Sequence, residues 1–285
     1  MKAKSLYQKL NKDFELNKCK DDWSEIETND LIAKDFNKRY MGLFLDSASE
    51  IKGCFTAVFP SELILKKVLT SGKKDILLFL HHPMIWNLGF KGYPFKSIQR
   101  ETLLKLKQNR ISVYVLHVPL DKNGQYSTTV SLAKALEIKP KSYFCKYFGV
   151  KVGVIGKTNC KTVDEMAQKI ETAVGHKLKI WSYGSSKIKN GIVALIAGGG
   201  NDPDAIKEIA GFGINLFITG VTKPNKNFQP SIDAHNVAKK NKINIIGATH
   251  YSTEKFACLA MNNYFKKIGL PGQFLDDRPD LKDLQ

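Results

Sequence analysis

Two adjacent histidines at the end of an apolar run are the residues of this sequence best placed for chemistry. The run Ile76–Leu80 follows charged residues and leads into His81, His82 and Pro83. Five apolar residues in this setting predict a strand buried on both faces, as in parallel sheets covered by helices. In α/β proteins the carboxyl ends of such strands carry binding and catalytic residues. Taken alone, the pair is read equally well as ordinary polar residues at a strand end.

The two imidazoles can serve one site only under certain geometries. Adjacent side chains of a strand point to opposite faces, and Pro83 keeps His82 extended. Both rings reach one site if the strand ends there and the chain turns, or if two metal ions lie side by side.

Two later strand ends carry further candidate ligands. His117 and Asp121 follow the expected strand 111–116, and His250 and Glu254 follow the expected strand 243–246. A helix that begins at His250 places Glu254, four residues later, on the same face, whereas a start nearer residue 252 puts Glu254 in the first turn, where the helix dipole favours a carboxylate. Singly, each is better explained as a turn, capping or solvated residue; their joint placement favours a site.

Gathered at one place, these side chains would form a mixed nitrogen and oxygen ligand set. Three imidazoles and two carboxylates suit zinc, iron, manganese or nickel better than calcium or magnesium. Five ligands exceed what one catalytic ion with an open position needs, and they fit two ions bridged by a carboxylate and a water. The candidate ligands are His81, His82, Asp121, His250 and Glu254.

The remaining histidines and a glycine run receive weaker assignments. We expect His117 to be a supporting or structural residue, His176 to lie at the surface, and His235 to face solvent or support the site. The run 198–200, three glycines before an expected helix, could bind an anion or form a tight turn. It matches neither a Walker loop nor a dinucleotide fingerprint, so no cofactor-binding residues are assigned.

The elements that must position these residues alternate along the chain. Strands are expected near 41–46, 51–59, 76–80, 111–116, 148–155, 177–181, 191–196, 214–218 and 243–246. Helices are expected near 60–69, 97–108, 128–136, 163–174, 204–210, 232–240 and 255–267. This order predicts an α/β fold of two lobes, about 1–145 and 146–285, with mainly parallel or mixed sheets flanked by helices. We expect the metal site in the cleft between the lobes.

Composition narrows the class of protein. The 285 residues are 43% hydrophobic and 25% charged, with no apolar run of membrane-spanning length and no signal-peptide pattern, so we expect a soluble cytoplasmic protein with no membrane partner. Five cysteines without a CxxC pair argue against a zinc knuckle, a redox pair or a disulfide framework. The net charge of +17 allows a nucleic-acid or nucleotide partner, but the dispersed lysines favour a solvated surface over specific nucleic-acid binding.

The motifs, in this order, resemble the Ngg-interacting-factor-three-like family, also described as type 2 GTP cyclohydrolase homologues. The resemblance spans about residues 40 to 265 and is carried by the segments 41–43, 80–84, 116–121, 197–200, 217–220 and 249–254. It implies a two-lobed α/β fold, a dinuclear metal site with the five ligands named above, and a homohexamer. The chain departs from the family pattern at Val118-Pro119, at Val221 in place of an acid, and at Thr249 in place of glycine.

We therefore expect a dinuclear metal-binding protein that acts as a metal-dependent hydrolase on a nucleotide or phosphorylated small molecule. The resemblance names the ring opening of GTP as the reaction, and Glu254 is the expected catalytic residue. The alternative is a non-enzymatic, hexameric metal-binding scaffold or regulatory protein whose partner is another protein or a nucleic acid.

Overall fold

The computed structural model describes residues 1–27 and 29–285, and its contacts divide the chain into two compact units. Unit 1 contains Met1–Leu120 and Cys258–Arg278, and unit 2 contains Asp121–Ala257 and Pro279–Gln285. These units do not follow one boundary near residue 145, which lies inside a strand of unit 2. Each unit is instead made of two separate pieces of the chain.

Unit 1 is built on a five-stranded sheet in the order β1-β6-β3-β2-β13. Its strands are β1 (Gly42–Leu45), β2 (Gly53–Ala57), β3 (Ile76–Leu80), β6 (Ile111–Val115) and β13 (Gly272–Phe274). The ladders are parallel except for β1, which runs antiparallel to β6. The five apolar residues of β3 are all buried at the centre of this sheet, as their pattern predicts. A short pair, β4 (Ile85–Trp86) and β5 (Phe95–Lys96), follows the histidines.

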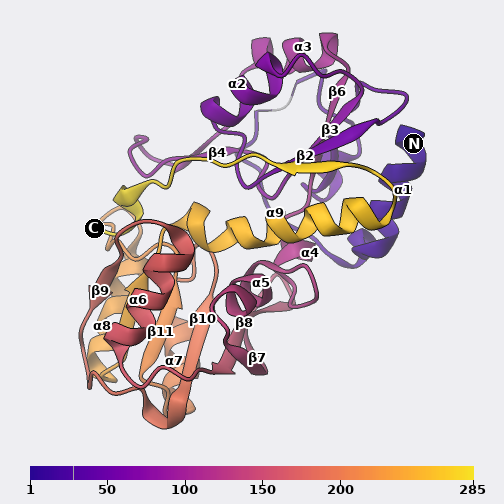
Figure 1. The fold of residues 1–285 in the computed structure, drawn as a ribbon. Helices are drawn as coiled ribbons and strands as arrows, with labels where there is room; N and C mark the ends of the chain where they lie inside the picture. The colour runs from indigo at the N-terminus through magenta and orange to yellow at the C-terminus, as the bar shows by residue number, and fades with distance from the viewer. Residues whose placement is uncertain (28) are drawn as a thin grey trace. The chain divides into compact units, whose positions relative to one another are not determined.

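Helices cover both faces of the unit 1 sheet. They are α1 (Ala3–Asp13), α2 (Glu62–Thr70), α3 (Arg100–Gln108) and the later part of α9 (His250–Lys267). On one face, Val68 of α2 and Leu103 of α3 share a core with Leu78 of β3. On the other face, the ring of Phe79 contacts Phe265 of α9. Figure 1 shows α2 and α3 together on the side of β2 and β3 away from this part of α9.

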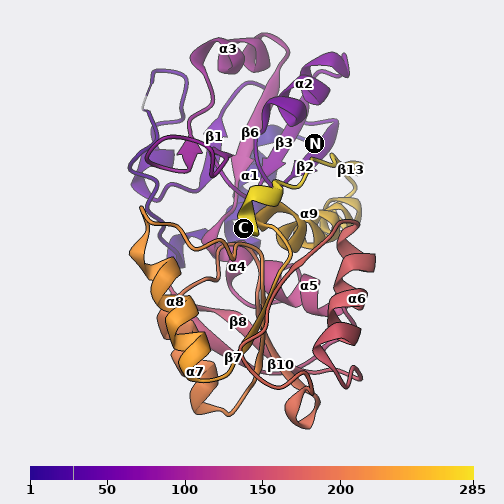
Figure 2. The ribbon, with the colours of Figure 1, turned by 90° about the vertical axis from the view of Figure 1, so that its left-hand side faces the viewer.

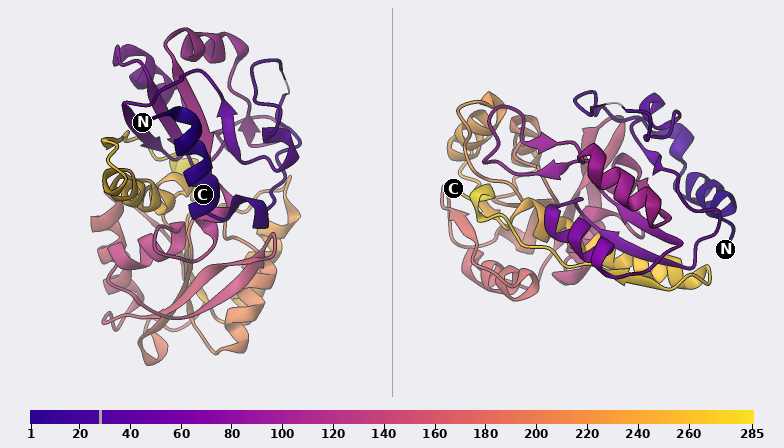
Figure 3. Two further views of the ribbon diagram at one scale, coloured as in Figure 1. Left: turned by 90° about the vertical axis from the view of Figure 1, so that its right-hand side faces the viewer. Right: turned by 90° about the horizontal axis from the view of Figure 1, so that it is seen from above.

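Unit 2 is built on a six-stranded mixed sheet in the order β7-β8-β10-β11-β12-β9. Its strands are β7 (Lys139–Tyr147), β8 (Val150–Lys157), β9 (Lys179–Trp181), β10 (Ile192–Ile196), β11 (Leu216–Thr219) and β12 (Asn244–Gly247). The central ladders β10–β11 and β11–β12 are parallel, and the outer ones are antiparallel. The long β7–β8 hairpin, seen in the left view of Figure 3, turns at Phe148 and Gly149, which both have positive φ.

Helices also cover both faces of the unit 2 sheet. They are α5 (Thr128–Ala135), α6 (Val163–Val174), α7 (Pro203–Gly211) and α8 (Gln229–Lys240). The one-turn α4 (Val118–Asp121) contains the last residues of the first unit 1 segment and the first residue of unit 2. Short 3-10 turns lie at Leu16–Lys18, Phe36–Lys38, Lys189–Gly191 and Leu281–Asp283. Leu132 of α5 and Met166 of α6 pack with Leu195 on one face. Ile206 of α7 and Ala234 of α8 pack on the other, so that α6 lies opposite α7 and α8 in Figure 2.

The α/β class predicted from the alternation of elements is confirmed. Both sheets are parallel or mixed and carry helices on both faces. Within the described residues the five cysteines form no disulfide. Across the same residues, no helix combines the length and the apolar character that crossing a bilayer requires.

Candidate metal-binding residues

His81 and His82 lie at the carboxyl end of β3, inside unit 1. Their backbone N–H groups donate to the carbonyls of Ala57 and Val58, at 3.2 and 2.9 Å, and the chain then turns at Pro83. Both side chains are buried, with 0% and 2% exposure, and their ring centroids are 4.4 Å apart. The turn at the strand end therefore brings together two rings that a continuing strand would separate.

Neighbouring groups determine the tautomer of the His81 ring and the orientation of the His82 ring. Nδ1 of His81 lies 3.0 Å from the carbonyl oxygen of Leu116. Because a carbonyl only accepts, Nδ1 must carry the proton, and Nε2 carries the lone pair of the neutral ring. The ring of His82 stacks on Phe59 with centroids 4.5 Å apart and planes 14° apart.

His117 joins the same cluster from the end of β6. Its side chain is 6% exposed, and its ring centroid lies 5.0 Å from that of His81 and 4.6 Å from that of His82. One ring nitrogen from each of the three histidines lies within 4.8 Å of the others. Unit 1 thus groups three buried imidazoles, one more than we expected as ligands.

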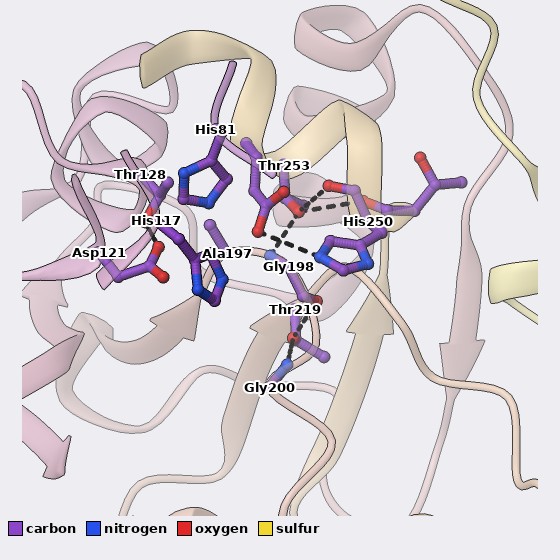
Figure 4. A network of polar contacts seen from close by, with 12 residues as sticks. His81, His117, Asp121, Thr128, Ala197, Gly198, Gly200, Thr219, His250 and Thr253 are labelled. Atoms are coloured by element: carbon purple, nitrogen blue, oxygen red, sulfur yellow. Dashed lines mark hydrogen bonds and ion pairs between the residues drawn. The ribbon is translucent and has the colours of Figure 1, made fainter. Parts of the chain in front are cut away.

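Asp121, His250 and Glu254 belong to unit 2. Asp121 ends α4, and its Oδ1 accepts a 2.8 Å hydrogen bond from the hydroxyl of Thr128 (Figure 4). His250 begins α9 and Glu254 follows one turn later, with Nε2 of His250 3.2 Å from Oε1 of Glu254. Carboxylate oxygens of Asp121 and Glu254 lie within 4.8 Å of each other. The helix therefore begins at His250 and places both residues on one face, the first of the two predicted geometries.

Gly198 lets the chain pass directly against this pair. A Cβ atom at this position would lie 2.1 Å from Oε1 of Glu254 and 3.1 Å from Nε2 of His250, and the residue has φ of +75°. Its N–H donates to the hydroxyl of Thr253 at 2.8 Å, which Figure 4 shows beside His250. The glycine run therefore has a definite role, which its sequence alone did not distinguish from that of an ordinary turn.

The C-terminal segment secures the start of α9 within unit 2. Oδ2 of Asp283 accepts the backbone N–H of His250 at 2.8 Å, and the Asp283 side chain is 1% exposed. The Asp283 carbonyl also accepts N–H groups of Thr222 and Lys223, at 2.8 and 2.9 Å. A carboxylate at a helix N-terminus satisfies an otherwise unbonded donor and complements the helix dipole. Sequence analysis missed Asp283, which lies in a polar tail.

Thr249, which stands where the family pattern has glycine, adopts φ of +61°. This left-handed region is unfavourable for a β-branched residue, by roughly 1–2 kcal/mol. The Thr249 hydroxyl offsets part of the strain, because it accepts the N–H of Ser252 at 3.3 Å and bonds the Ser252 hydroxyl at 2.9 Å. The departure therefore keeps the backbone shape that glycine would adopt without strain.

The two other histidines have structural contacts in unit 2. His235 is 7% exposed, so the expectation that it faces solvent is wrong. Its Nε2–H donates to the Thr222 carbonyl at 2.7 Å, and Tyr183 donates to its Nδ1 at 2.9 Å. Burial lowers the pKa of His235 below its usual value, against a smaller opposing effect of the Thr222 bond. His176 is half-buried and bonds the Ser252 hydroxyl at 2.8 Å.

The imidazole and carboxylate groups in each unit are suitable ligands for zinc or a transition-metal ion. Neutral imidazole nitrogen and carboxylate oxygen are ligands of zinc, iron, manganese and nickel, and ligating histidines usually bond a carbonyl or carboxylate through the other ring nitrogen. His81 has this arrangement through Leu116. The close approach of Gly198 to Glu254 also holds a carboxylate in a defined place beside His250.

A family model and the sequences of known relatives identify the same family for this chain. The sequence matches Duf34/NIF3 (NGG1p interacting factor 3) over residues 31–275. A protein of Archaeoglobus fulgidus named GTP cyclohydrolase 1 type 2 homolog is 29% identical over 237 residues, which cover 82% of this chain and 88% of that protein. A protein of Pyrococcus abyssi with the same name is 30% identical and covers 70% of this chain and 75% of its own length.

Solved structures show the same fold. TTHA1606 from Thermus thermophilus superimposes with a TM-score of 0.71 at 22% identity, covering 99% of this chain and all of that one. Reduced HcgD from Methanocaldococcus jannaschii superimposes with a TM-score of 0.66 at 21% identity, covering 97% of this chain and 98% of that one.

Replacing Gly198 by alanine should displace the Glu254 carboxylate, because the new Cβ would lie 2.1 Å from Oε1. We expect a loss of about 1–3 kcal/mol in the free energy of unfolding, measured by urea denaturation. The matched control is Gly199→Ala, where an added Cβ meets nothing within 4 Å. Equal stability of the two variants would contradict this role of Gly198.

Replacing Asp283 by alanine should leave the His250 N–H buried without its acceptor. The expected cost is about 1–3 kcal/mol in the free energy of unfolding, again from urea denaturation. Asp35→Ala is the control, since the Asp35 side chain is 87% exposed in its pair with Lys38. A variant at position 283 as stable as this control would show that the tail does not secure α9.

The lowered pKa of His235 makes stability depend on pH. The unfolded chain takes up a proton near pH 6.5 while the folded protein does so only at lower pH, so this residue lowers stability as pH falls below about 6.5. We expect the urea midpoint to fall less between about pH 7.5 and 5.5 in His235→Gln than in the wild type. His176→Gln, at the half-buried histidine, is the control, and equal falls in wild type and His235→Gln would refute the assignment.

Proposed function

This chain belongs to the Duf34/NIF3 family, and we propose on that premise that it is a metal-dependent hydrolase acting on a nucleotide or another phosphorylated small molecule. Its relatives' name, GTP cyclohydrolase 1 type 2 homolog, makes GTP the first substrate to test. The proposal concerns the chemistry of the candidate ligands, and it does not depend on which of the four metals they hold.

The observation that carries the proposal is the burial of metal-type donors in each unit. None of the five candidate ligands is more than 9% exposed. Withdrawing imidazoles and carboxylates from water is costly unless hydrogen bonds or a cation compensate. A divalent ion can supply part of that compensation to imidazole and carboxylate alike, in addition to the hydrogen bonds that these side chains make.

We assign ion binding to His81 and His82 in unit 1 and to Asp121, His250 and Glu254 in unit 2. Divalent ions held by such ligands supply Lewis-acid chemistry, which activates water and polarises a substrate. Glu254 is the residue to which we assign proton transfer, because the contacts with His250 and Gly198 orient its carboxylate. The net charge of +17 would favour the approach of an anionic substrate.

A metal-binding scaffold without turnover is the second candidate. It is favoured by Val221, which stands where the family pattern has an acid. The Val221 N–H donates to the Gly198 carbonyl at 3.0 Å, so this departure adjoins the turn that presses against Glu254. Because valine has no carboxylate, position 221 cannot supply a group for proton transfer.

The proposal predicts tight binding of divalent ions, about two per chain, measured by elemental analysis after dialysis against zinc, manganese, nickel or ferrous iron. Glu254→Gln should weaken binding by at least about 100-fold, because losing even an outer-sphere partner costs 10–100-fold. Glu137→Gln is the control, at a glutamate of unit 2 whose side chain is 78% exposed.

Activity assays then separate the two candidates. We expect metal-loaded wild type to hydrolyse GTP or a phosphoester and Glu254→Gln to lose that activity, whereas Glu137→Gln keeps it. Metal binding by the wild type without hydrolysis of any of these compounds would favour the scaffold. Failure to bind any of the four metals would remove both candidates.

A further inference from the structure

Asp21 is a buried carboxylate that the family motifs do not include. It lies in unit 1, before the region of family similarity, and its side chain is 1% exposed. Its Oδ1 accepts the N–H of Asp22 at 2.9 Å, and its Oδ2 accepts the indole N–H of Trp23 at 2.6 Å. The same Oδ2 lies 2.6 Å from Nδ1 of His117. A buried carboxylate with this many donors is held in one place.

This contact decides which nitrogen of His117 carries the proton. An ionised carboxylate only accepts, so Nδ1 of His117 must donate to Asp21, and Nε2 carries the lone pair of the neutral ring. His81 is set in the same way by the Leu116 carbonyl. Two of the three clustered imidazoles therefore have their Nδ1 hydrogen directed to an oxygen and their Nε2 suited to a metal ion.

Trp23 connects the carboxylate to the ring cluster. Besides donating to Asp21, its indole contacts His117 edge-on with centroids 5.1 Å apart, and it contacts His82 edge-on at 5.7 Å. Trp23 itself is 4% exposed. One side chain thus holds the carboxylate by a hydrogen bond and packs against two of the imidazoles.

We propose that His117 is a metal ligand in unit 1 alongside His81 and His82, and that Asp21 is the positioning residue that orients it. The cluster supports this, because one nitrogen of each histidine lies within 4.8 Å of the others. A carboxylate that accepts from the second nitrogen of a ligating histidine fixes its tautomer and raises its basicity. The inference rests on the proposed metal binding and adds a third imidazole, suited to zinc, to the unit 1 donors.

The test uses the whole chain of residues 1–285 loaded with zinc and asks two questions that activity does not answer. Competition with a chromophoric chelator gives zinc affinity, and X-ray absorption at the zinc edge gives the number of imidazole ligands. Asp21→Asn should weaken zinc binding by about 10–100-fold, because an amide can donate to Nδ1 and favour the wrong tautomer. His117→Gln should lower the imidazole count.

Asp22→Asn is the matched control, since Asp22 is the exposed neighbour and its Oδ1 accepts a local hydrogen bond from the Ser24 N–H. It should leave zinc affinity and imidazole count at wild-type values. If Asp21→Asn does not fold, Trp23→Phe takes its place, because it removes the indole donor but keeps an aromatic ring, and zinc binding should again weaken.

The outcomes distinguish this inference from the proposed function. Failure of the wild type to bind zinc or any other of the four metals would overturn the proposed function. Zinc binding by the wild type with unchanged affinity in Asp21→Asn, or in Trp23→Phe where that variant replaces it, would overturn the role of Asp21 alone. An imidazole count in His117→Gln equal to that of the wild type would overturn the assignment of His117 as a ligand.

Discussion

The dominant constraint on this protein is the free-energy cost of withdrawing imidazoles and carboxylates from water. Asp21, His81, His117, His250, Glu254 and Asp283 are all buried. Each is held by specific contacts, such as the Leu116 carbonyl for His81 and the His250 N–H for Asp283. The packing around them therefore has to specify orientation as well as volume. This requirement explains why turns and tails that carry no motif of their own still bear on the candidate ligands.

Sequence reasoning succeeds where a local pattern has one physical meaning. The short apolar run of β3, bounded by charged residues and a proline, favours a buried strand, and the spacing of His250 and Glu254 matches the helical repeat of α9. Strand β7 was missed because it is an edge strand whose side chains are mostly exposed, and its turn uses Phe148 in place of the usual asparagine. Strand β13 was missed because three residues in a polar tail carry no periodicity.

The candidate ligands could be predicted from their residue types and positions at strand ends. The carboxylates that hydrogen-bond to His117 and His250 could not. Asp21 and Asp283 are ordinary acids in polar stretches, and only the folded chain brings them to His117 and His250. Thr249, the residue before His250, is a second case in which the sequence does not reveal the local structure. A threonine there reads as a capping residue, and its left-handed backbone becomes evident only in three dimensions.

The division of each unit into separate pieces of chain has a consequence for biosynthesis. Strand β13 and the later part of α9 complete unit 1, yet they are synthesised only after residues 121–257 of unit 2. Synthesis adds about 5–20 residues per second, so the β2 edge and the part of one sheet face that α9 covers stay exposed for many seconds during translation. Unit 1 can therefore complete its sheet only after most of unit 2 has been synthesised.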